Sequence, residues 1–87
     1  MSDAARPVRA EGIEIHEVVD GFVVYDPTRD KVHYLNHTAA VVLQLCDGNN
    51  GAHEISGFIQ KAYDLSEPPI EEVRECLGLL VSEGLVA

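Results

Sequence analysis

The spacing of apolar residues changes once along this chain, at Asn36, and this change constrains the fold more than any other feature. Before Asn36, apolar and polar residues alternate with a period of two, which is typical of half-buried strands. After Asn36 the period is about 3.6, which is typical of amphipathic helices. The sequence therefore predicts an α+β fold in which a three-stranded antiparallel sheet is followed by three helices.

The first two predicted strands form a hairpin. The first begins at Ile13, where isoleucines alternate with polar residues, and its apolar phase changes over residues 17–19, which indicates a β-bulge. Asp20-Gly21 follows and predicts a two-residue hairpin turn, because both residue types tolerate positive φ. Residues 22–25 are almost continuously apolar, as is typical of a central strand with both faces covered.

The third predicted strand spans residues 31–35 and follows a turn that contains a proline. A period of two places Val32 and Tyr34 on one face of this strand, and His33 and Leu35 on the other. If the strand pairs with the second strand, its opposite side is an edge of the sheet.

Three helices are predicted after the strands. Asn36 is a suitable N-cap for the first helix, and Gly48 ends it in the left-handed conformation that glycine favours. The second helix begins at residue 51 or 52, and the third follows Pro68-Pro69 and stops before Gly84. The predicted buried faces are Ala39, Val42, Leu43 and Cys46 in the first helix and Ile55, Phe58, Ile59 and Ala62 in the second.

The apolar face of the third helix is unusually wide. It covers about 200° of the helical wheel, whereas burial against one side of a core needs only about 100°. The excess is available for a second helix, a dimer partner or a ligand. The arc consists of Ile70, Val73, Cys76, Leu77, Leu79, Leu80 and Val81.

Size and charge exclude several classes of protein. With 87 residues the chain makes a single domain, and 46% apolar residues are too many for a disordered acidic protein. The 15 acidic and 6 basic residues give a net charge of −9, which argues against nucleic acid because phosphate binding needs a basic face. No segment approaches the ~20 consecutive apolar residues of a membrane span, so no membrane partner is expected.

Residues 1–12 show no periodicity and are predicted to be a flexible tail before a domain that spans residues 13–87. The tail lacks the apolar region of a signal peptide. Cys46 and Cys76 lie far apart in the sequence, in apolar stretches, and a disulfide between them is left open. A reduced, cytoplasmic protein is the simplest expectation.

Catalytic motifs are not found in this sequence: it has no nucleophile elbow, phosphate loop or HExxH pattern. Its four histidines do not have the spacing of a closed metal site. His33 and His37 are four residues apart, but they lie on either side of the predicted boundary between strand and helix. We therefore expect that the protein is not an enzyme and holds no metal or cofactor.

The third strand is predicted to be an edge of the sheet with little to prevent another strand from pairing with it. It carries one charge, Lys31, and no proline that would block pairing with another strand. An exposed edge beside a wide apolar helix suits peptide binding by strand addition, in which main-chain bonds give affinity and pockets give specificity. The alternative is an edge that is covered by the N-terminal tail or by a second subunit.

Several short runs carry a resemblance to a known family: residues 34–40, which contain Leu-Asn-x-Thr-Ala, residues 43–48, which contain Leu-Cys-Asp-Gly, and residues 54–55, 63–64 and 80–86. In these runs the chain resembles the PqqD-like family. Its members are the peptide chaperones of pyrroloquinoline quinone (PQQ) biosynthesis and their relatives, also called RiPP recognition elements. The resemblance extends from about residue 13 to residue 86.

This resemblance implies a winged-helix-like fold and a non-catalytic binding module. The module would capture the leader segment of a ribosomally synthesised precursor peptide by strand addition to the third strand. It would then present the leader to a modifying enzyme, commonly a radical S-adenosylmethionine (SAM) enzyme. Carried onto this sequence, the leader would pair with Lys31, Val32, His33, Tyr34 and Leu35, and the helix wall would come from Val73, Arg74, Leu77, Leu80 and Val81.

Two other functions stay open beside this one. The first is a structural or regulatory winged-helix protein whose groove is filled by its own copy, and the sequence does not decide between a monomer and a homodimer. The second is a DNA-binding winged helix. Against DNA binding, the third helix offers Arg74 as its only cation, and its acids would repel phosphates.

Overall fold

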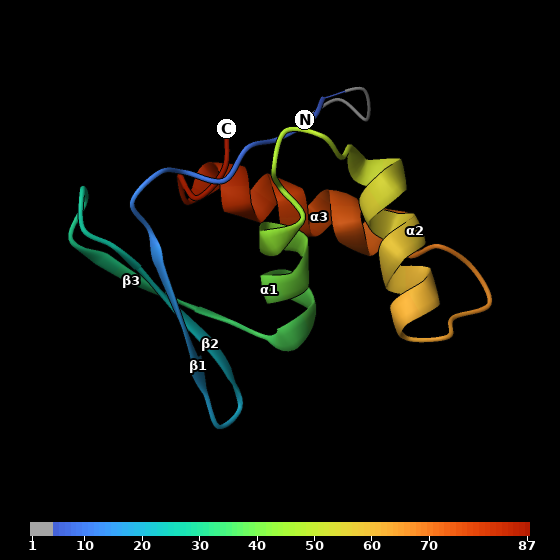
Figure 1. The fold of residues 1–87 in the computed structure, drawn as a ribbon, viewed down its shortest axis with the longest axis horizontal. Coiled ribbons are helices and arrows are strands. Elements are labelled where there is room, and N and C mark those ends of the chain that lie inside the picture. The colour runs from blue at the N-terminus through green and yellow to red at the C-terminus, as the bar shows by residue number, and fades with distance from the viewer. Residues whose placement is uncertain (1–4) are drawn as a thin grey trace.

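The computed structural model describes residues 5–87, which form a three-stranded antiparallel sheet followed by three helices (Figure 1). This confirms the predicted α+β fold and the order of its elements. The strands are β1 (Glu14–Val18), β2 (Gly21–Asp26) and β3 (Lys31–Leu35), and the helices are α1 (His37–Gln44), α2 (Ala52–Ala62) and α3 (Ile70–Ser82).

Strand β2 lies at the centre of the sheet, as its continuous apolar run predicts. It pairs with β1 on one side and with β3 on the other, and the side chain of Val24 is fully buried. Strand β3 pairs with β2 alone among the described residues, so its outer side is an edge of the sheet. The predicted edge position of β3 is thereby confirmed.

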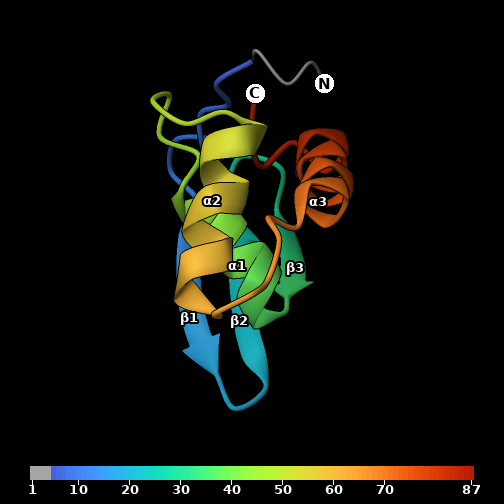
Figure 2. The ribbon, with the colours of Figure 1, turned by 90° about the vertical axis from the view of Figure 1, so that its right-hand side faces the viewer.

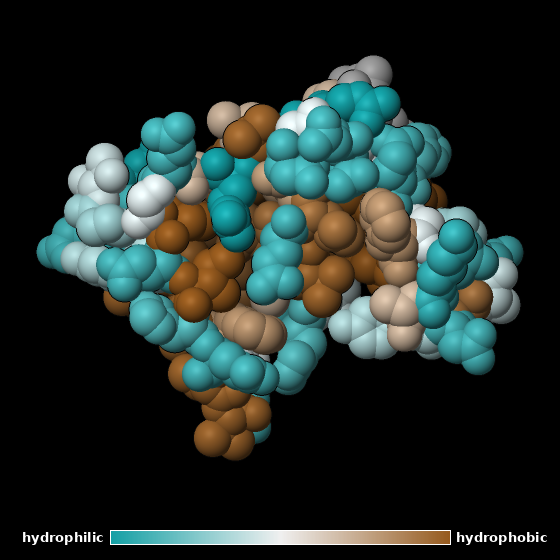
Figure 3. Space-filling view, viewed as in Figure 1, coloured by the Kyte–Doolittle hydropathy of each residue, from teal (hydrophilic) through white to brown (hydrophobic). Residues whose placement is uncertain are grey.

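The hairpin between β1 and β2 differs from the prediction. Pairing is uninterrupted up to Val18↔Gly21, so the bulge predicted at residues 17–19 is wrong and the turn consists of Val19 and Asp20. Gly21 is instead the first residue of β2, where a Cβ would lie 2.5 Å from the Leu35 carbonyl oxygen. The glycine therefore allows a close approach between strands. Val19, in the turn, is 97% exposed, and the tip of this hairpin is hydrophobic (Figure 3).

Part of the segment predicted as a tail, residues 1–12, is tied to the other end of the chain. The N–H of Val8 donates to the Ala87 carbonyl at 3.0 Å, and the N–H of Ala87 donates back to the Val8 carbonyl at 2.9 Å. None of the backbone hydrogen bonds of residues 7–10 goes to β3, so this segment does not cover the β3 edge. Residues 1–4 lie outside the described residues.

The helices begin where the sequence predicts, but the predicted end of the first helix at Gly48 is wrong: α1 ends at Gln44, and Gly48, with φ +86°, lies in the loop that follows. Asn36 caps α1, and its Oδ1 accepts a hydrogen bond from the N–H of Ala39 at 2.8 Å. Helix α2 begins directly after Gly51, whose N–H donates to Glu54 Oε1 at 2.7 Å. This bond supplies half of a capping box, because glycine has no side chain for the other half.

The core lies between the inner face of the sheet and the helices (Figure 2). Helix α1 packs against β2, β3 and α3, whereas α2 packs mainly against α3. Because α2 has this one main neighbour, its buried face is narrower than predicted: Ile55 and Ile59 are buried, but Phe58 and Ala62 are exposed. The largest buried side chains are Val24, Val42, Leu43, Ile55, Ile59, Val73, Leu77 and Leu85.

Candidate functional site

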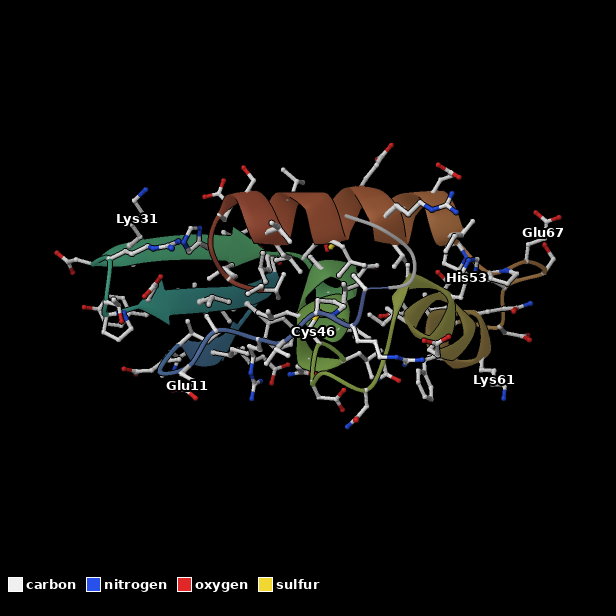
Figure 4. All side chains as sticks on the ribbon, turned by 90° about the horizontal axis from the view of Figure 1, so that it is seen from above. Glu11, Lys31, Cys46, His53, Lys61 and Glu67 are labelled. Carbon is white, nitrogen blue, oxygen red and sulfur yellow. The ribbon has the colours of Figure 1, made fainter. Side chains whose placement is uncertain are left out.

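A groove separates β3 from the C-terminal half of α3. The strand and the helix run in opposite directions along the same side of the molecule (Figure 4), and a cavity of about 360 Å³ lies between them. We call this cavity the β3–α3 groove. Its lining consists of Val32, His33, Tyr34, Leu35, Leu79, Leu80, Glu83 and Leu85.

The strand wall of this groove exposes apolar side chains next to an unpaired backbone edge. Val32 and Tyr34 are 66% and 60% exposed, while His33 and Leu35 on the opposite face are half-buried. This confirms the predicted division of the strand into two faces. Lys31 is exposed at the start of β3 and does not line the groove.

The helix wall differs from the set of residues predicted for it. Of that set, only Leu80 lines the β3–α3 groove. Val73 and Leu77 are buried in the core, because they form the centre of the wide apolar arc. Arg74 is paired with Glu71 at the start of α3, and Val81 is partly exposed outside the groove.

Leu79, Glu83 and Leu85 line the groove but were not among the predicted site residues. Leu79 stands at one extreme of the apolar arc and is 65% exposed. The width of the arc signals that a surface beyond the core exists on α3, but it does not say which side of the helix faces β3. That choice follows from how α3 packs against α1.

His33 joins the two walls of the groove. Its Nδ1 lies 3.5 Å from Oε2 of Glu83, the residue that caps the C-terminal end of α3, and its side chain is only 12% exposed. Its Nε2 is buried and has no hydrogen-bond partner among the described residues. The main role of the ring is therefore to connect β3 with the end of α3. It presents little polar surface to solvent.

The C-terminal end of α3 is closed by the turn between β2 and β3. The Arg29 guanidinium donates to the Glu83 carbonyl at 3.3 Å, which is a favourable position for a cation at a helix C-terminus. Gly84 has φ +76°, and a Cβ there would overlap the Arg29 guanidinium. Both the backbone conformation of this turn and the contact with Arg29 therefore favour glycine at this position.

The two cysteines are free thiols, and burial suppresses their ionisation. Burial raises the pKa of the Cys46 thiol to about 12, and it raises the pKa of the Cys76 thiol as well. Both side chains are therefore protonated near neutral pH, whereas a reactive cysteine needs a lowered pKa. Within residues 5–87 no three His, Cys, Asp or Glu side chains gather as a metal site would require, and no helix is long and apolar enough to cross a membrane.

A match to a protein-family model shows which family this chain belongs to. The family model for coenzyme PQQ synthesis protein D (PqqD) matches residues 21–86. The chain belongs to the PqqD family. No curated protein and no solved structure gives a significant match. PqqD proteins are non-catalytic accessory proteins that bind a precursor peptide and work with the enzymes of PQQ biosynthesis. The matched range contains β2, β3 and all three helices, so both walls of the groove lie inside the PqqD domain.

Proposed function

We propose that this protein captures the leader segment of a ribosomally synthesised precursor peptide by adding it as a strand to β3, and presents it to a modifying enzyme. The observation that carries this proposal is the unpaired edge of β3 next to the β3–α3 groove. Backbone groups on such an edge can supply hydrogen bonds to an extended peptide, whatever its sequence.

The groove gives selectivity for particular leader sequences, which backbone hydrogen bonds alone do not give. In an extended peptide every second side chain points to the same face, so alternate leader residues would enter the groove. Its exposed apolar lining, above all Val32, Tyr34 and Leu79, favours apolar side chains at those positions. Burying such side chains contributes about 25 cal/mol per Å² of apolar surface.

The residues proposed to bind the leader include the strand residues predicted from sequence together with a corrected helix wall. Val73, Arg74, Leu77 and Val81 do not line the groove, and we replace them with Leu79 and its neighbours. The proposed binding residues are Lys31, Val32, His33, Tyr34, Leu35, Leu79, Leu80, Glu83 and Leu85.

For the partner enzyme we propose the radical SAM class, since PqqD proteins work with PQQ biosynthesis enzymes and the resemblance described above implies this class. We propose the cytoplasm as the location. Both cysteines are free thiols in the structure, which agrees with a reducing compartment.

A chemical-shift titration tests the proposal. The protein is labelled with ¹⁵N and titrated with a synthetic peptide that covers the leader of a candidate precursor. We expect the amide resonances of residues 31–35 and 79–85 to shift, while those of β1, which provides the opposite edge of the sheet, stay in place. Absence of any shift at saturation, or shifts confined to β1, would overturn the proposal.

Replacing Val32 by proline tests strand addition directly. Proline has no N–H and a fixed φ, so it removes a main-chain donor of β3 or distorts the edge. We expect Val32→Pro to weaken peptide binding at least about tenfold. The control is Glu17→Pro on β1. Like Val32, Glu17 occupies a non-hydrogen-bonded position of its strand pair, so its N–H points away from β2 and the change leaves β3 intact. Equal affinities of the two variants would contradict strand addition to β3.

A further inference from the structure

Two more hollows continue the β3–α3 groove along α3. The middle hollow, of about 340 Å³, lies between the start of α1 and the centre of α3, and it shares Leu79 with the groove. The α2 hollow, of about 310 Å³, lies where α1, α2 and the start of α3 meet, and it shares Thr38 and Glu72 with the middle hollow. The three depressions therefore follow α3 from Glu83 to Pro69.

The direction of β3 leads into these hollows. The strand runs toward α1, opposite to α3 (Figure 4), and Asn36, the residue that follows it, lines the middle hollow. A peptide added to β3 therefore leaves the sheet at the end of the strand and meets the middle hollow next. The part of α3 between Leu79 and Pro69 is about 15 Å long, a distance that about four or five extended residues span.

The α2 hollow is suited to one large apolar side chain. Ile59 and Val73 form its floor, and Tyr63, Leu65 and Pro69 form its sides. Leu65 is 41% exposed, so an occupant of the hollow would remove its side chain from water. The volume is at the lower end of the range for ligand pockets, which agrees with a single aromatic or large aliphatic group.

The charges along the three hollows all have the same sign. The charged side chains that line them are the carboxylates of Glu72, Glu75 and Glu83, and no lysine or arginine among residues 5–87 lines any of the three. An occupant with lysine or arginine between its apolar residues would neutralise these carboxylates, whereas an acidic peptide would be repelled.

Building on the function proposed above, we propose that the leader is bound along the whole of α3 and not at β3 alone. The segment beyond the β3-paired part crosses the middle hollow with at least one lysine or arginine. It then places an aromatic or large aliphatic side chain in the α2 hollow, about four or five residues past the residue that contacts Leu79. Continuity of the three hollows and their shared negative charge are the grounds for this assignment.

The test uses peptides selected from a phage library of about 16 random residues, long enough to cover both sites. The 87-residue protein is the bait. Two forms of the tightest binder are synthesised: the full peptide, and a shortened peptide that keeps only the part that pairs with β3. The affinity of each peptide is measured for the natural protein, for Leu65→Ser and for Phe58→Ser. Phe58 is 50% exposed and lines none of the three hollows, so it is the matched control.

We expect Leu65→Ser to weaken binding of the full peptide about tenfold and Phe58→Ser to change it less than about twofold. The shortened peptide should bind the natural protein about tenfold more weakly and should not distinguish the variants. This second comparison needs no mutant and so remains informative if Leu65→Ser does not fold.

The outcomes separate this inference from the function on which it rests. If Val32→Pro abolishes binding but neither Leu65→Ser nor shortening the peptide weakens it, the second anchor is overturned and strand addition stands. Binding that survives Val32→Pro, or a library that yields no binding peptide, overturns the proposed function itself.

Discussion

At Gly84 both the backbone conformation and the packing favour glycine over other residues. Its φ of +76° lies in the left-handed region, and the Arg29 guanidinium occupies the space where a Cβ would project. The side chain of Arg29 is flexible at its end, so it can move away, but it then loses its hydrogen bond to the Glu83 carbonyl. This contact connects the turn between β2 and β3 with the end of α3.

Gly84→Ala should lower the free energy of unfolding by about 1–2 kcal/mol, because alanine is strained at positive φ and displaces Arg29. The matched control is Gly78→Ala, inside α3, where a Cβ would meet no atom within 4 Å. That variant should gain about 0.5–1 kcal/mol from higher helix propensity. Chemical denaturation measures both, and equal effects of the two substitutions would contradict this account.

Two residues show which structural roles a sequence pattern can predict and which it cannot. Asn36 is predictable as an N-cap because its chemistry is local and needs only the amides that follow it. Gly21 is misread as a turn residue because its role depends on the Leu35 carbonyl, which belongs to another strand. A pattern along the chain contains no information about such a neighbour.

At the scale of elements, the change of period at Asn36 is enough to predict three strands, three helices and their order. It also predicts which side chains of β3 share a face. The width of the apolar arc of α3 predicts that a surface beyond the core exists, but the side of α3 that faces β3 depends on the packing of α3 against α1. Leu79 could therefore not be chosen over Val81 from the sequence.

Asn36→Ala should destabilise the start of α1, because the Ala39 N–H loses its acceptor. We expect a loss of about 1 kcal/mol in the free energy of unfolding. Asn36→Asp should keep most of the stability, since a carboxylate accepts the same bond and is favourable at a helix N-terminus. Asn49→Ala, an exposed asparagine outside the helices, is the control and should change stability by less than about 0.5 kcal/mol. A loss of stability in Asn36→Asp as large as that in Asn36→Ala would argue against the cap.

At the scale of the whole molecule, the net charge of −9 limits which partners can approach. Three of its carboxylates, those of Glu72, Glu75 and Glu83, lie along the hollows beside α3, where a basic peptide would meet them. The same surface opposes nucleic acid, since α3 presents acids where a DNA-reading helix presents cations.

Binding of a peptide that contains lysine or arginine should therefore weaken with salt. Between about 0.1 M and 1 M salt the screening length falls from about 10 Å to about 3 Å, and we expect affinity to fall at least about threefold. The double variant Glu72→Gln and Glu75→Gln should show a smaller salt dependence. Glu67→Gln, in the loop between α2 and α3 and outside the hollows, should behave like the natural protein. Affinity that does not change with salt would refute an electrostatic contribution.

The reciprocal hydrogen bonds between Val8 and Ala87 have a consequence for how this domain can be joined to others. They hold the two ends of the described chain together, and neither residue lines the groove or the hollows beside α3. A second domain fused before residue 7 or after Ala87 would therefore leave from the same place on the surface. Either order of fusion in a single polypeptide would then attach a companion enzyme at the same point relative to the bound peptide.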